Sequence, residues 1–395
     1  MADNKDLQSK PRTPPWRDPN IRAIAFQVIA ILALFWAGWT LFQNTLTNME
    51  SRGISTGFGF LEQPAGFGII MSLIPYNETM SYGRTFVVGL LNTVLVSALG
   101  IVFATILGFV VGIARLSRNW LVAKLAAAYI EIFRNIPLLL QVFFWYFAVL
   151  RNLPSPRQSA SLADAIFLNN RGVYVPKPVF QDGFGVVIAA LVIAIVATVF
   201  VYRWAKQRQN RTGQPFHTFW TGFGLIVGLP LLAYVIMGAP LSWDTPALKG
   251  FNFGGGMVVI PELGALLAAL TVYTAAFIAE IVRSGILSVS HGQTEAASAL
   301  GLRPGLTLRL VIIPQAMRVI IPPLTSQYLN LTKNSSLATA IGYPDLVAVF
   351  MGTTLNQTGQ AVEIVAMTMA VYLTLSLSIS LFMNFYNRAV ALKER

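Results

Sequence analysis

The stretch Glu295-Ala-Ala-Ser-Ala-Leu-Gly301, which continues to Val311-Ile-Ile-Pro314, separates two long apolar segments of the chain. Alanine, leucine and glutamate favour helix by intrinsic propensity, and glycine suits the residue just past a helix end, where the backbone needs a positive φ. The stretch therefore predicts a short helix, a turn at Gly301 and a second segment that leads into the next apolar part of the chain.

The composition excludes an ordinary soluble domain. Hydrophobic residues make up 55% of the chain and charged residues 11%, with a mean hydropathy of +0.62, whereas soluble domains carry about 25% charged residues. The net charge of +12 does not by itself indicate nucleic acid, because basic residues of membrane proteins gather in particular loops. Cysteine is absent, and His217 and His291 are too far apart for a metal site. The sequence predicts an all-α polytopic membrane protein without metal or nucleic acid.

Eight segments are apolar and long enough to cross about 30 Å of hydrocarbon. We expect the polar residues 1–22 to form a cytoplasmic tail, residues 23–42 to form a first span that is retained, and residues 43–85 to form an outer loop. The other spans are expected at 86–114, within 123–150, and at 183–202, 219–238, 257–287, 316–341 and 361–383. We expect loops between them, including a loop with Arg151, Arg157, Arg171 and Lys177 before Gly183 and a Gly-rich loop through Gly256.

The basic residues give these spans an orientation. Most of them fall in segments that are cytoplasmic if both termini are cytoplasmic, and the fourth and fifth spans, for example, are joined by Arg203, Lys206, Arg208 and Arg211. Lysine and arginine are enriched in cytoplasmic loops of membrane proteins. An even number of spans with both termini inside therefore places Glu295 in the cytoplasm.

Two of the spans contain the spacing Glu-x-x-Arg, at Glu131 and Arg134 and again at Glu280 and Arg283. Residues three apart share a helix face, so each pair can neutralise itself. Neutralisation matters because one ionisable group in hydrocarbon costs about 2.5–3.5 kcal/mol on insertion scales. We interpret both pairs as structural ion pairs that also position the region around Glu295.

The seventh span is unusual because it is rich in polar residues. Pro322-Pro323 is expected to break its start, and the candidate pathway residues that follow are Gln327, Asn330, Lys333, Asn334 and Ser335. A polar face in the membrane must line a water-filled cavity or pack against protein, and a cavity is the simpler account. Lys333 then needs a partner, and a substrate carboxylate and the side chain of Glu363 are equally suitable.

The loop around Glu295 resembles the coupling loop of binding-protein-dependent ABC importer permeases. That pattern is E-A-A, three residues, G, nine residues and I-x-L-P, with Val311 and Ile313 here in place of I and L; the matching residues are Glu295, Ala296, Ala297, Gly301 and Pro314. Residues 129–141, 276–283 and 333–337 resemble signatures of the polar amino-acid branch of the family. The long build resembles the general L-amino-acid permease subunit or the similar glutamate/glutamine/aspartate one.

This resemblance implies a five-helix type I ABC importer core of the MetI-like kind over residues 86–390, with helices inserted at 183–238 and a coupling loop at 288–315. It implies a permease subunit of an ATP-driven amino-acid importer in the bacterial inner membrane. The implied partners are two ATP-binding subunits, a second permease that is a homologue or a copy, and a periplasmic amino-acid-binding protein. No G-x-x-x-x-G-K-[ST] loop occurs, so ATP and Mg are expected on the partner ATPase, and this chain has no catalytic residue or cofactor.

Two other functions stay open from the residues alone. An ion-coupled secondary amino-acid carrier would also have intramembrane carboxylates and a broken helix, but it would not need the coupling loop. A structural or signalling subunit would leave transport intact when it is deleted.

Overall fold

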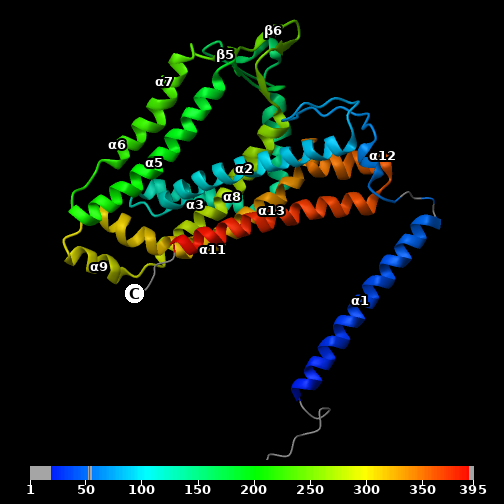
Figure 1. Ribbon diagram of the computed structural model, residues 1–395, viewed down its shortest axis with the longest axis horizontal. Coiled ribbons are helices and arrows are strands. Elements are labelled where there is room, and N and C mark those ends of the chain that lie inside the picture. The colour runs from blue at the N-terminus through cyan, green and yellow to red at the C-terminus, as the bar shows by residue number, and fades with distance from the viewer. Residues whose placement is uncertain (1–18, 52, 54–55, 391–395) are drawn as a thin grey trace, which may run out of the picture.

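Long helices make up most of the computed structural model, which describes residues 19–51, 53 and 56–390 (Figure 1). Seven helices in these ranges are long and apolar enough to cross a membrane, and a bent helix pair makes eight when it is counted as one span. The chain is therefore a polytopic, mostly helical protein, as its composition predicts. The predicted tail at 1–22 lies, up to residue 18, outside the described residues.

The core of the molecule is a helix bundle formed by α2 (Tyr82–Arg115), α8 (Pro261–Leu287), α11 (Ile313–Asn334) and α13 (Ala361–Val390). α2 has buried small residues at every fourth position, Gly100, Ala104, Gly108 and Gly112; Gly108 and Gly112 lie against α8, whereas Gly100 lies against Leu331 of α11. A Cβ atom at Gly108 would lie 2.6 Å from the Cβ of Ile278. Small residues at this spacing let two helix backbones approach closely inside a membrane.

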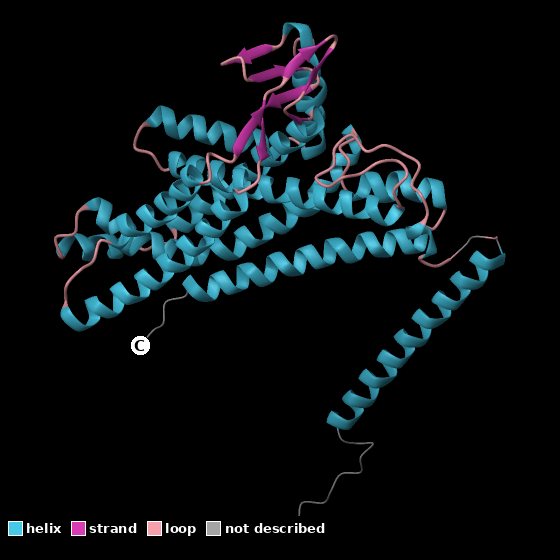
Figure 2. Ribbon diagram, turned by 45° about the horizontal axis from the view of Figure 1, so that its top comes forward, coloured by secondary structure: helices cyan, strands magenta, loops and turns pink. Residues whose placement is uncertain are grey.

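Helix α1 (Pro19–Ser51) contains the predicted first span and stands apart from the bundle in both views (Figures 1 and 2). The segment between α1 and α2 includes the short 3₁₀ helix η2 (Gly59–Glu62). Phe60 in η2 is 2% exposed, and its ring centre lies 6.2 Å from that of Tyr82. The outer segment is thus folded onto the beginning of α2.

The third predicted span is not one straight helix. It consists of α3 (Trp120–Asn135) and a second segment made of α4 (Leu138–Phe143), the π-helical η3 (Phe144–Val149) and η4 (Leu150–Asn152), bent by 105° from α3. Pro137 lies at the bend, since proline disfavours helix in the residue before it and lacks an N–H donor. The buried Gln141 amide then donates to the carbonyl oxygens of Phe133 and Ile136, both at 3.0 Å.

The inserted helices form a hairpin of their own. α5 (Phe184–Thr212) packs against α6 (Thr218–Phe223), the π-helical η6 (Gly224–Gly228) and α7 (Leu229–Ile236). α5 extends ten residues beyond its predicted end at 202, so the basic residues that follow the span are part of the helix. Gly213, with φ of +70°, ends α5.

The segments on either side of the hairpin were expected to be loops, and this expectation was wrong. They contain short antiparallel strands, with sheet orders β1-β2-β3-β8, β4-β5 and β6-β7 (Figure 2). The strands are β1 (Ala160–Leu162), β2 (Ile166–Asn169), β3 (Gly172–Val175), β4 (Lys177–Phe180), β5 (Leu241–Asp244), β6 (Ala247–Lys249), β7 (Asn252–Gly254) and β8 (Met257–Val259), and the short helix η5 (Pro156–Gln158) precedes them. The two segments pair across the insertion, for example Val173 with Val259, and distant pairing of this kind leaves no local sequence signal.

The seventh span continues through its two prolines. Pro322 and Pro323 lie inside α11, so the predicted break at the start of the span was wrong. Proline is tolerated within membrane helices where neighbouring groups satisfy the freed carbonyls. The chain then runs through η8 (Ser335–Ile341), the π-helical η9 (Val347–Thr354) and α12 (Leu355–Thr358) into α13.

Candidate functional site

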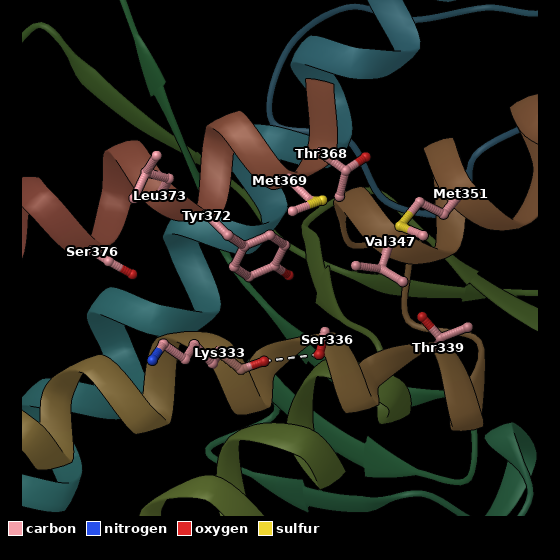
Figure 3. A pocket seen from close by; sticks show the side chains of 10 residues that line it. All are labelled: Lys333, Ser336, Thr339, Val347, Met351, Thr368, Met369, Tyr372, Leu373 and Ser376. Atoms are coloured by element: carbon pink, nitrogen blue, oxygen red, sulfur yellow. Dashed lines mark hydrogen bonds between the residues drawn. The ribbon is translucent and has the colours of Figure 1, made fainter. Parts of the chain in front are cut away.

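A cavity of about 680 Å³ opens between the end of α11, η9 and α13. Figure 3 shows Lys333 and Ser336 on one wall and the ring of Tyr372 opposite them, pointing into the space between. The residues that line the cavity are Lys333, Ser336, Thr339, Val347, Met351, Thr368, Met369, Tyr372, Leu373 and Ser376. Its wall therefore combines one cation, several hydroxyl groups and two flexible thioethers.

Lys333 supplies the only charged side chain in this lining. The ion pairs found among the described residues join Glu280 to Arg283 and His291 to Glu295, and neither includes Lys333. Glu363, the alternative partner expected from the sequence, instead accepts the backbone N–H of Gly57 at 2.6 Å. The predicted Lys333–Glu363 ion pair is therefore not formed.

The other predicted pathway residues are spread around α11. Ser335 is fully buried, and its hydroxyl donates to the carbonyl of Thr332 at 2.7 Å. Gln327 and Asn334 are half-buried, whereas Asn330 is exposed, and none of these four lines the cavity. Ser326, Asn330 and Lys333, spaced by four and three residues, form one exposed polar face of the helix.

A buried carboxylate that the sequence did not single out lies beside the cavity. Asp345 is 0% exposed; one of its oxygens accepts the N–H of Ala348 at 2.8 Å, and the other lies 3.4 Å from the hydroxyl of Tyr372. The neighbouring Leu346 N–H donates to the hydroxyl of Thr93 in α2 at 3.0 Å. In the sequence, the only sign of this site is that Asp345 is a single acidic residue between apolar segments.

The chain around Glu295 has the predicted conformation. α9 (His291–Ala299) is followed by Gly301 with φ of +74°. The N–H of Leu302 donates to the carbonyl of Ala297 at 3.1 Å, and that of Gly301 donates to Ser298 at 2.9 Å. These two bonds form a Schellman motif, which satisfies the last carbonyls of a helix and needs glycine at the left-handed position. The predicted helix and glycine turn are confirmed.

The outer face of α9 is open. Glu295 is exposed, and its carboxylate contacts Nδ1 of His291, which is exposed as well, at 3.0 Å. Ala296 is exposed as well, whereas Ala297 is 2% exposed and packs inward. Leu300, at the tip of the turn, is 81% exposed. A carboxylate and a large apolar side chain are thus presented together on one short helix.

The segment that follows α9 leads directly into α11, whose last turn reaches the cavity. α10 (Pro304–Thr307) and the π-helical η7 (Leu308–Ile312) lead into α11, which has Pro314 in its first turn. The amide of Gln315 donates to that of Gln293 at 3.1 Å, so the beginning of α11 is tied to α9.

The two predicted ion pairs have different outcomes. Arg283 Nη2 lies 2.7 Å from Glu280 Oε1, and both side chains are partly buried. Glu131 and Arg134 form no salt bridge; Glu131 is exposed, and the Arg134 guanidinium lies 5.1 Å from the centre of the Phe277 ring on α8. This contact is favourable because a guanidinium is attracted to an aromatic face. Within the described ranges, no three His, Asp or Glu side chains come together in a way that could hold a metal ion.

Comparison with known proteins gives a consistent result. Residues 214–392 match the family described as binding-protein-dependent transport system inner membrane component. The chain is 62% identical to the permease protein YhdX of Escherichia coli (strain K12), and the similarity covers 96% of each chain. It is 56% identical to the general L-amino acid transport system permease protein AapQ of Rhizobium johnstonii, over 96% of this chain and 94% of that one. It is 44% identical to the glutamate/glutamine/aspartate/asparagine transport system permease protein BztB of Rhodobacter capsulatus, over 96% of each.

Such identity over nearly the full length of both chains confirms the resemblance seen in the loop at Glu295, and with it the predicted fold class. The chain belongs to the binding-protein-dependent transport system inner membrane components, as a multi-pass permease subunit of an ABC transporter.

Proposed function

We propose that this chain forms the translocation pathway of an ATP-driven amino-acid importer. The names of its relatives support the substrate class, and the higher identity to a general L-amino-acid permease than to a glutamate-type permease supports a broad range of amino acids. Met351 and Met369 in the cavity wall fit a broad range, because methionine adapts its shape to different side chains.

The observation that carries this proposal is the continuous path from α9 to the cavity. α11 has 22 residues, which span about 33 Å, close to the thickness of the hydrocarbon layer. Its first turn is bonded to α9, and its last turn carries Lys333. A displacement of α9 by an ATPase would therefore reach the cavity through one rigid element.

The exposed face of α9 supports docking to a separate ATP-binding subunit. Glu295 and Leu300 would contact that subunit, and Ala296, Ala297, Gly301 and Pro314 would hold the loop in shape. Two copies of the subunit would bind ATP and Mg, and a periplasmic binding protein would deliver the amino acid. Because the chain belongs to the ABC transporter permeases, we do not propose an ion-coupled carrier.

A second permease, either a homologue or another copy of this chain, would cover the polar face of α11. Ser326, Asn330 and Lys333 are exposed on that face, and polar side chains within a membrane span do not face lipid. The pathway would then lie between the two permeases, with Gln327, Asn334 and Ser335 stabilising its wall.

The orientation proposed has both termini in the cytoplasm. In Figure 1, α9, the turn between α5 and α6 and the C-terminal end of α13 lie at one end of the molecule, and the strands and α12 lie toward the other. A reporter fused after Arg208 should therefore read as cytoplasmic and one fused at Asn169 as periplasmic. The reverse pattern would contradict the assignment of α9 to the cytoplasm.

Lys333 is the group proposed to receive the carboxylate of the amino acid. In proteoliposomes containing the whole transporter, Lys333→Met should raise the half-saturating substrate concentration at least about tenfold, because a charged hydrogen bond is worth roughly 1.5–3 kcal/mol. Lys249→Met, on the exposed strand β6, is the control and should leave uptake unchanged. Wild-type uptake and substrate-stimulated ATP hydrolysis in Lys333→Met would refute this role.

The coupling loop can be tested separately. Gly301→Val forces a β-branched residue into a left-handed conformation and should weaken association with the ATP-binding subunit, measured by co-purification. Gly305→Val is the matched control, since Gly305 has ordinary φ and open space around it. Equal co-purification of the two variants would show that the turn at Gly301 is not used for docking.

A further inference from the structure

A basic surface closes the inserted hairpin at the turn between α5 and α6, and none of its residues lines the cavity. Its charges come from Arg203, Lys206, Arg208 and Arg211 in the last turns of α5. No aspartate or glutamate occurs between Asp182 and Asp244, so nothing in the hairpin neutralises these charges. We call residues 203–217 the basic turn.

Aromatic rings give the basic turn a defined shape. The ring centres of Trp204 and Phe216 lie 5.3 Å apart, edge to face. The Arg208 guanidinium lies 5.6 Å from the Trp204 ring and donates to the side chain of Gln214 at 3.1 Å. Tryptophan and arginine in contact at the end of a membrane helix are typical of the interface between hydrocarbon and water.

One face of α5 joins this surface to the hydrocarbon. Residues spaced by three or four along a helix share a face. Such a row is formed by Ile188, Val192, Ile195, Val199, Arg203 and Lys206. The four apolar members are between 47% and 55% exposed. Ala190 and Ala194 are buried on the opposite face, where α5 packs against the rest of the hairpin.

We propose that this face of α5 binds an anionic phospholipid. The phosphate would lie at Arg203 and Lys206, and an acyl chain would follow the apolar row toward Ile188. From Ile188 to Val199 the helix rises about 16 Å, which matches the depth of one leaflet, half of roughly 30 Å of hydrocarbon. The basic end of this face therefore matches the phosphate of a phospholipid, and the apolar row matches its acyl chain.

The ATP-binding subunit is the other occupant that the position of the basic turn would allow. The turn lies at the same end of the molecule as α9 in Figure 1. Contact with a soluble subunit would use the charges alone, and it would not account for the exposed apolar row that continues beneath them. The combination of both features on one face favours lipid.

The test is a titration of the full-length chain, purified in detergent as part of its complex, with phosphatidylglycerol and with phosphatidylethanolamine, read by native mass spectrometry. Each basic residue near a membrane surface strengthens the binding of anionic lipid about fivefold. Arg203→Gln with Lys206→Gln should therefore weaken phosphatidylglycerol binding at least about tenfold and leave phosphatidylethanolamine binding unchanged. Arg203→Lys with Lys206→Arg should bind like the wild type.

The matched control removes the same charge elsewhere. Lys177→Gln with Lys249→Gln, both on exposed strand positions, should bind phosphatidylglycerol within about twofold of the wild type. If the Arg203/Lys206 double variant does not fold, the single variant Lys206→Gln is measured instead, and its affinity for phosphatidylglycerol should fall about fivefold.

Three results would overturn the proposal. The first is equal loss in the Arg203/Lys206 variant and in the Lys177/Lys249 control. The second is displacement of the lipid by inorganic phosphate at millimolar concentration, which would show a simple anion site. The third is unchanged lipid binding combined with loss of the ATP-binding subunit from the complex, which would assign the basic turn to that subunit.

Discussion

The inserted hairpin is about as apolar as the central helices α2 and α8 but is much less buried. The most apolar stretch of α5 has a mean hydropathy of 3.0 and is 11% buried, whereas that of α8 has a mean hydropathy of 2.0 and is 56% buried. Hydrophobicity alone thus does not decide which helices form the core of this protein. Lipid is as apolar as leucine, so helices associate in a membrane through close packing and polar contacts.

The packing difference is visible in the glycines. Gly108 and Gly112 of α2 are covered by α8, so that an added Cβ would meet Ile278 or Val282 within 3 Å. Gly224 and Gly228 in the hairpin have nothing within 4 Å of an added Cβ. Close packing of α2 against α8 thus depends on glycine, whereas Gly224 and Gly228 of the hairpin have no close neighbour.

The largest effect is expected from Gly108→Val. Valine there would force α2 and α8 apart and should cost about 3 kcal/mol or more, the upper end for an overpacked site. The measurement is the temperature of half-unfolding and the yield of monodisperse protein in detergent. Gly224→Val should change stability by about 0.5 kcal/mol or less. Equal losses in both variants would remove the distinction between the core and the hairpin.

A smaller loss is expected from Gln141→Leu at the bend between α3 and α4. The substitution leaves the carbonyls of Phe133 and Ile136 without their donor in a buried place, which costs about 1–3 kcal/mol. The control is Gln207→Leu, since Gln207 is an exposed residue of α5. The measurement is the unfolding temperature of each variant. If Gln141→Leu unfolds at the same temperature as the wild type, Pro137 alone maintains the bend.

Local patterns were enough to predict several parts of the structure. The spans follow from runs of apolar residues, and the turn at Gly301 follows from helix propensity and the need for a positive φ. Lys333 was placed at a cavity because a cation deep in a membrane needs a polar surrounding.

Features that depend on distant contacts were not predictable. The pairing of β3 with β8 crosses the inserted hairpin, and Tyr372 and Asp345 meet only once α13 has packed against η9. Glu131 and Arg134 have the same spacing as Glu280 and Arg283, so the sequence alone predicts the same ion pair for both. Tertiary packing places Phe277 beside Arg134, and this contact is not visible in the sequence. Pro322 and Pro323 illustrate the same point, because α11 keeps its course in spite of a local preference to break.

The two Glu-x-x-Arg pairs allow a sharper test inside the core. A double-mutant cycle with Glu280→Gln and Arg283→Gln should give a coupling energy of about 0.5–1 kcal/mol, because the pair is only partly buried. The same cycle at Glu131 and Arg134 should give a value near zero. A similar coupling at both pairs would show that the first pair forms in the membrane after all.

The smallest effect on the core is expected from removing the hairpin altogether. β4 and β5 are paired antiparallel, with Phe180 opposite Leu241, and the N–H of Gln181 donates to the carbonyl of Pro240 at 3.2 Å. The two ends of the insertion are thus already adjacent. Replacing residues 182–239 with Asn-Gly would close them with a two-residue hairpin turn, for which this pair of residues is preferred.

Because two helices are removed together, the direction of every later span is preserved in this variant. α5 packs against α6, η6 and α7, so the core should keep its unfolding temperature within about 1 °C, which corresponds to a change in stability of about 0.5 kcal/mol in a chain of this size. Assembly with the ATP-binding subunit and uptake should persist, while the proposed binding of anionic lipid at Arg203 and Lys206 disappears. Loss of assembly on excision would instead show that the hairpin belongs to the transport core. The low burial of the hairpin helices would then not mean that the core is independent of them.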